Sequence, residues 1–85
     1  MLSAIVSRAL GVTDQVRGAL EQKNLRLVTK YLRKLESVNI ELENALAEAK
    51  DENLDDANEA RQKLHASILS CEVFVANYEL KNITF

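Results

Sequence analysis

The stretch LRLVTKYLRKLESVNIELENALAEA, residues 25–49, decides the fold of this chain. Its apolar residues recur in alternating steps of three and four, which is the heptad spacing of a helix that packs along one face. We call this the first heptad face, and it consists of Leu25, Val28, Leu32, Leu35, Asn39, Leu42, Leu46 and Ala49. The pattern predicts one helix over about residues 24–50, with Asn24 as its candidate N-cap and Asn39 as its polar exception. A start further upstream is equally open, because residues 21–23 are good helix formers.

A second heptad face follows, but it is out of phase with the first. It consists of Leu54, Ala57, Arg61, Leu64, Ile68, Cys71, Val75 and Tyr78. A continuous helix would have to carry a rotation of about 100° at the junction, whereas a chain reversal at residues 51–53 explains the shift more simply. Asn53 can then cap the second helix, and Asp55 and Asp56 fall in its first turn, where the helix dipole favours carboxylates.

The two heptad faces fit together as an antiparallel hairpin. Facing layers of such a hairpin have residue numbers with a nearly constant sum, and each layer from Ala49–Ala57 to Val28–Tyr78 sums to 106 or 107. The sequence therefore predicts helices over about 24–50 and 54–82 that close on each other along their whole length. On this register Arg61 lies near the turn, where it can reach solvent or the acidic residues Glu48 and Asp51.

The composition supports an all-α protein. The 85 residues include no Pro, two Gly and one Cys, which excludes a turn-rich β-sandwich or barrel and an intrachain disulfide scaffold. A hydrophobic share of 47% is too high for a disordered chain. The length allows one domain, residues 1–85. We therefore expect a small helical bundle in which an N-terminal helical segment packs on the hairpin.

The N-terminal segment supplies a third apolar face, formed by Leu2, Ile5, Val6, Ala9, Leu10, Val16, Ala19 and Leu20. Two interpretations of Gly11 are open. In one, Gly11 ends a short helix in the left-handed conformation, and Thr13 or Asp14 caps a new helix. In the other, a single helix places Gly11 and Gly18 on one small-residue face that allows close helix approach. We favour the break at Gly11.

The last predicted helix has a further apolar stripe that a two-helix hairpin would leave in water. This C-terminal stripe consists of Leu69, Val73, Ala76, Leu80 and Ile83, with Phe74 beside it. Either the N-terminal segment covers it, through Leu2, Ile5 and Val6, or a second copy or another protein does. We expect a homo-oligomer with an interface at these residues. Asn39 would then set the register of a multi-chain bundle.

Charge is segregated along the chain, although the formal net charge is only -2. A basic face precedes an acidic tip near the predicted turn. The acidic tip consists of Glu48, Asp51, Glu52, Asp55, Asp56 and Glu59. The basic face consists of Lys23, Arg26, Lys30 and Arg33, with Lys34 beside it. The simplest interpretation is a solvated helix face that Glu72 and Glu79 partly neutralise. The alternatives are contact with the phosphates of a nucleic acid or nucleotide, or docking of an acidic protein.

Patterns typical of catalysis or metal binding are missing. His65 and Cys71 lie six residues apart, about 240° round a helix, so they cannot pair on one helical face. Position 62 is Gln, which removes the Glu-x-x-His pair of a di-iron bundle. No glycine-rich phosphate loop is present. We expect no cofactor and no metal site, with Cys71 buried as a small apolar residue and His65 at the boundary of the core.

These observations predict a non-enzymatic interaction protein, an adaptor, assembly factor or inhibitor, that self-associates and binds a protein partner. The alternative function is binding of a nucleic acid or phosphorylated ligand through the basic face. Arg8 interrupts the apolar start where a signal peptide needs an unbroken stretch, and no run approaches the roughly 20 apolar residues that span a bilayer. We therefore expect a cytoplasmic protein, with an amphipathic N-terminal helix on a membrane surface as the alternative.

Overall fold

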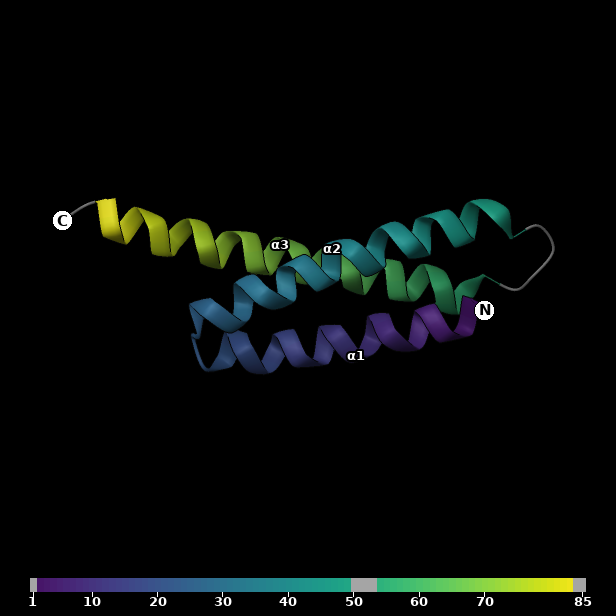
Figure 1. Cartoon of the computed structure of the whole chain (residues 1–85), viewed down its shortest axis with the longest axis horizontal. Helices are drawn as coiled ribbons and strands as arrows, with labels where there is room; N and C mark the ends of the chain where they lie inside the picture. Colours follow the sequence, from purple (N-terminus) through teal and green to yellow (C-terminus); the bar gives the residue numbers. More distant parts are fainter. Residues whose placement is uncertain (1, 50–53, 84–85) are drawn as a thin grey trace.

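A computed structural model shows three helices packed as a bundle (Figure 1). Helix α1 spans Leu2–Glu21, α2 spans Leu25–Glu48 and α3 spans Asp55–Ile83. The structure describes residues 2–49 and 54–83, and within these ranges it contains no strand. The predicted all-α fold is confirmed, and so are the two helices of the hairpin and the packing of the N-terminal segment on them.

The ends of α2 follow from local hydrogen bonding. The backbone N–H of Leu27 donates to Oδ1 of Asn24 at 3.1 Å, which confirms Asn24 as the N-cap. At the other end, Ala49 has extended backbone angles while its N–H still donates to the Ala45 carbonyl. Asp55 lies in the first turn of α3, as predicted. The expected cap at residue 53 lies outside the described residues.

Helix α1 is unbroken, so the expected break at Gly11 is wrong. Gly11 does not adopt a positive φ. Thr13 lies in the middle of the helix, where its Oγ1 donates to the Leu10 carbonyl at 2.8 Å instead of capping a new helix. A helical glycine costs only about 1 kcal/mol relative to alanine, and packing against two helices outweighs that cost. A Cβ at Gly11 or Gly18 would meet no atom within 4 Å, so neither glycine serves a close helix approach.

The turn between α1 and α2 forms without glycine. Lys23 adopts a left-handed conformation with φ of 53°. Its N–H donates to the Leu20 carbonyl at 3.1 Å, and the N–H of Asn24 donates to the Ala19 carbonyl at 3.2 Å. This pair of bonds is a Schellman motif, which satisfies the last carbonyls of α1. Lys23 therefore lies in the turn and does not continue the helical face of the other basic residues.

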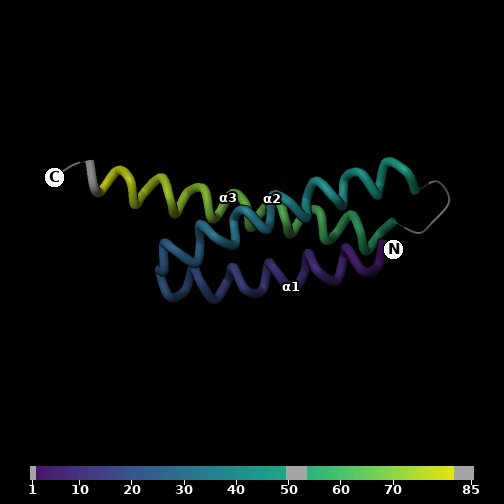
Figure 2. Tube along the Cα trace, viewed as in Figure 1, coloured from purple at the N-terminus to yellow at the C-terminus, as the bar shows by residue number. Residues whose placement is uncertain are grey.

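The core lies between all three helices. Its buried apolar residues are Ala9, Val16 and Ala19 of α1, Val28, Leu35, Val38 and Leu42 of α2, and Ala57, Ala60, Leu64 and Cys71 of α3. Helix α1 runs beside the crossing of α2 and α3 (Figure 2). Val38 and Ala60 are buried although neither belongs to a predicted heptad face. They are buried because each helix of the hairpin packs against α1 as well as against the other hairpin helix.

The expected closure of the hairpin along its whole length is wrong at its last layer. The middle layers Leu42–Leu64 and Leu35–Cys71 are fully buried, as the register predicts. In the last layer Val28 is buried but Tyr78 is 43% exposed. The C-terminal end of α3 continues beyond the α1–α2 turn and away from the start of α2 (Figure 1). All described side chains from residue 76 to residue 81 are exposed.

Candidate interaction surface

The C-terminal stripe lies on the outward side of α3. Leu69 is 61% exposed, Val73 50% and Leu80 60%, and Ala76 is exposed as well. Helix α1 packs on the other side of the hairpin, where its own buried residues enter the core. The N-terminal segment therefore does not cover the stripe, which was one of the two alternatives.

Four other residues expected at the interface belong mainly to the packing within the chain. Phe74 is half-buried and packs against the core, so it does not join the exposed stripe. Leu2, Ile5 and Val6 of α1 are half-buried in the same way. The side chain of residue 83 lies outside the described part of the chain. The exposed part of the C-terminal stripe therefore consists of residues 69, 73, 76 and 80.

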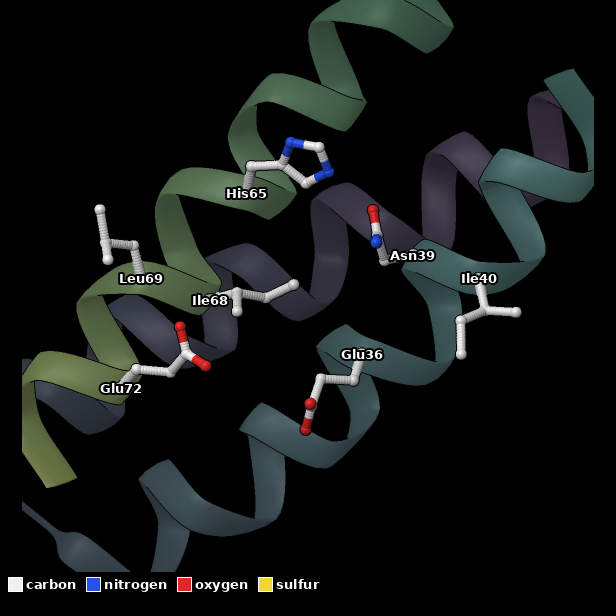
Figure 3. A pocket seen from close by; sticks show the side chains of 7 residues that line it. All are labelled: Glu36, Asn39, Ile40, His65, Ile68, Leu69 and Glu72. Atoms are coloured by element: carbon white, nitrogen blue, oxygen red, sulfur yellow. The ribbon is translucent and has the colours of Figure 1, made fainter. Parts of the chain in front are cut away.

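A shallow hollow between α2 and α3 borders the stripe (Figure 3). It measures about 380 Å³ and is lined by Glu36, Asn39, Ile40, His65, Ile68, Leu69 and Glu72. Ile40 lines the hollow from α2 and is 59% exposed, at the edge opposite Leu69 (Figure 3). The Oδ1 atom of Asn39 is buried and has no hydrogen-bond partner among the described residues. The hollow thus combines exposed aliphatic carbon with one unsatisfied amide oxygen.

An ion pair, and a second contact that is ionic only when His65 is protonated, lie exposed at the edge of the hollow. Glu43 Oε1 lies 3.7 Å from Arg61 Nη2 and 3.7 Å from His65 Nε2. Arg61 thus reaches an acid on α2, but Glu43 takes the place expected for Glu48. The side chains of all three residues are nearly half exposed, so solvent screens these pairs and they add little stability. His65 lies at the boundary of the core, as predicted.

The basic face is solvated along α2. Arg26, Lys30, Arg33 and Lys34 are exposed, and no described carboxylate comes within 4.0 Å of their nitrogens. The expected neutralisation by the two glutamates of α3 does not form as ion pairs. The Nζ atoms of Lys30 and Lys34 lie 6.0 and 5.6 Å from the centre of the Tyr31 ring, which partly shields both charges.

Cys71 is fully buried in the core, which confirms its predicted role as a small apolar residue. Burial raises the pKa of its thiol, and the negative charge of Glu72 raises it further. A thiol that holds its proton is a poor nucleophile. Cys71 thus contributes packing at this position.

Three further findings concern the whole described chain. Among residues 2–49 and 54–83, no three His, Cys, Asp or Glu side chains gather as a metal site. None of the described helices has the length and apolar character that crossing a bilayer requires. Comparison with protein-family models, with curated proteins and with solved structures found no match.

Proposed function

We propose that this protein is a non-enzymatic helical bundle that acts by protein–protein interaction and self-association. Its contact surface is the C-terminal stripe, extended by Ile40 across the hollow. A single observation carries the proposal, namely that three large aliphatic side chains of one helix face remain half or more exposed after the chain has folded. Contiguous exposed apolar surface of this kind marks interaction sites.

The stripe has enough unburied surface to drive association only with a partner that carries apolar surface of its own. Full burial of a Leu or Val side chain is worth about 1.5–3 kcal/mol, so covering the exposed part of Leu69, Val73 or Leu80 adds roughly 1–2 kcal/mol each. Association of two molecules costs about 4–15 kcal/mol in lost freedom. The stripe of one molecule cannot meet this cost against a polar surface. A partner with its own apolar stripe can.

The exposed end of α3 supports the same conclusion. Residues 76–81 form about one and a half turns of helix without a buried side chain. Most of the stability of a protein helix comes from tertiary packing of an apolar face. A partner packed on this end would supply the contacts that α1 and α2 do not.

Two matched substitutions test the proposal. Ala76 and Ala47 are both exposed helical alanines, but only Ala76 lies in the stripe. We expect the wild-type chain to associate with itself or with a protein partner in native mass and sedimentation measurements. Ala76→Glu should reduce that association at least tenfold, and Ala47→Glu should leave it unchanged. Circular dichroism would verify that both variants keep their helices. Equal behaviour of the two variants would contradict the proposal.

The basic face favours a second candidate function, binding of a phosphate-rich ligand such as a nucleic acid. Its supporting observation is that Arg26, Lys30 and Arg33 are exposed along one helix without a carboxylate partner among the described residues. Binding of a short nucleic acid over a salt series tests it. Arg26→Glu and Arg33→Glu should each weaken binding and flatten its salt dependence. Unchanged affinity in both variants would end this candidate.

A further inference from the structure

We infer that the partner on the C-terminal stripe is a second copy of this chain, which lies antiparallel along α3. Leu69 then packs against Leu80 of the second copy, and Val73 packs against its Ala76. The inference rests on the proposed function and adds to it the identity and the direction of the partner.

The spacing of the stripe is self-complementary when it is reversed. Its four exposed residues, Leu69, Val73, Ala76 and Leu80, are separated by steps of four, three and four. Read from either end these steps are the same, so a reversed copy places each of these four residues opposite another of the four. Each pairing joins an a position to a d position, which is the layer geometry of an antiparallel coiled coil. The central layers each combine the bulkier Val73 with the small Ala76. Such an interface is isologous and closes as a dimer.

The polar half of α3 argues against a parallel second copy. Towards the N-terminus the same helix face continues through Gln62, Glu59 and Asp55. A parallel copy would place Glu59 against Glu59 and Asp55 against Asp55, and opposed like charges are unfavourable at an interface. In the antiparallel pairing the two helices overlap only over their C-terminal halves. The acidic residues then lie outside the contact.

Charges beside the stripe complement this arrangement. Glu72 lies on the side of α3 that faces α2 (Figure 3), and Glu79, seven residues on, shares that side. The hairpin register places Arg33 of α2 beside Val73, and the antiparallel pairing brings Glu79 of the second copy within about one turn of that position. Arg33 has no carboxylate within 4.0 Å among the described residues.

The buried area is consistent with a dimer of modest affinity. Leu69, Val73, Leu80 and Ile40 each leave on the order of 100 Å² uncovered at their exposures. Their sum, roughly 400 Å², is about half of the roughly 800 Å² per partner of a standard interface. We therefore expect a weak dimer.

Site-directed cross-linking tests the direction of the pairing. In a Cys71→Ala background, which removes the sole cysteine of the chain, Val73→Cys and Ala76→Cys are prepared separately with tags of different mass. Under mild oxidation we expect the mixture to form a heterodimeric disulfide at least tenfold faster than either variant forms a homodimer. Ala47→Cys serves as the exposed control that should not cross-link. If Cys71→Ala impairs folding, the same variants with Cys71 retained give the same readout, because that thiol is buried.

The outcomes separate this inference from the proposed function. Cross-linking in the mixture alone supports the antiparallel copy. Cross-linking of each variant with itself would mean a parallel pair and overturn the inference, while the proposed function stands. A wild-type chain that stays monomeric and forms no cross-link would overturn the second copy as the partner. In that case, capture of a different protein that Ala76→Glu abolishes would still support the protein-interaction half of the proposed function, and its self-association half would fall.

Discussion

The two apolar faces of α3 differ in burial although their side chains are chemically alike. On the inner face, Leu64 and Cys71 are completely buried between α1 and α2. On the outward face, Leu69 and Leu80 are about 60% exposed. Hydrophobicity alone therefore does not decide which residues are buried. The number and length of the neighbouring helices decide it, because α1 can cover only one side of the hairpin.

The largest expected effect separates the two faces directly. Leu64→Ala removes a fully buried side chain and should lower the free energy of unfolding by about 2–5 kcal/mol. Leu80→Ala changes an exposed side chain, so dilute protein should lose less than about 0.5 kcal/mol. Urea denaturation at low protein concentration measures both values. Sedimentation should show the opposite order, with association weakened by Leu80→Ala. Equal losses of stability would mean that the two faces are not distinct.

The reactivity of the Cys71 thiol measures how often the inner face opens to solvent. Native protein should react with an alkylating reagent at least about a hundredfold more slowly than protein unfolded in urea, because only opened molecules expose the thiol. Labelling followed by mass spectrometry measures both rates. Rapid labelling of the native chain would show that the inner face opens readily near residue 71.

The raised pKa of Cys71 also gives a pH dependence with a definite sign. The folded thiol keeps its proton above the ordinary pKa of 9.0, whereas the unfolded thiol ionises first. The stability that the neutral thiol contributes is therefore complete below that value and decreases as the pH rises from it towards the folded pKa. Between about pH 8 and about pH 10.5, the free energy of unfolding should decrease more steeply with pH for the wild type than for Cys71→Ala. Parallel curves would contradict this assignment.

The hairpin could be predicted from the sequence because its information is local and repeated. The phase shift between the heptad faces required a reversal, and the register correctly predicted burial of both residues in layers such as Leu42–Leu64. The cap at Asn24 follows from the same local chemistry. Each of these signals involves the residues of only one helix or of two helices that are adjacent in the sequence.

Features that depend on the third helix could not be predicted in this way. Continuity through Gly11 depends on the packing of α1, which outweighs a local cost of about 1 kcal/mol. Burial of Val38 and Ala60 depends on where α1 docks on the hairpin. Lys23 adopts the left-handed conformation in the turn between α1 and α2, and a lysine does not predict this conformation as a glycine or asparagine would. The exposed stripe was visible in the sequence, but its exposure became evident only once α1 was placed on the other side.

Asn39 of α2 lines the hollow that borders the outward face of α3 and allows a further test of this region. Its Oδ1 is buried without a partner among the described residues, and an unsatisfied buried acceptor costs about 1–3 kcal/mol. Asn39→Leu should therefore stabilise the fold by about 1 kcal/mol in urea denaturation. If Asn39 sets register, the same variant should also populate more than one oligomer in native mass spectra. A loss of stability would show that the amide oxygen is satisfied in solution.

The smallest expected effect concerns the helix that covers the inner face. Gly11 of α1 is exposed, and a Cβ there meets no atom within 4 Å. Gly11→Ala should stabilise the fold by about 0.5–1 kcal/mol, because alanine loses less conformational freedom in a helix. Thermal and urea denaturation measure the gain. The dissociation constant of the associated form should not change, because α1 lies on the side of the hairpin away from the stripe. A gain in stability without a change in association separates the folding of the inner face from the function of the outward face. A loss of stability would instead indicate that α1 is interrupted at Gly11 in solution.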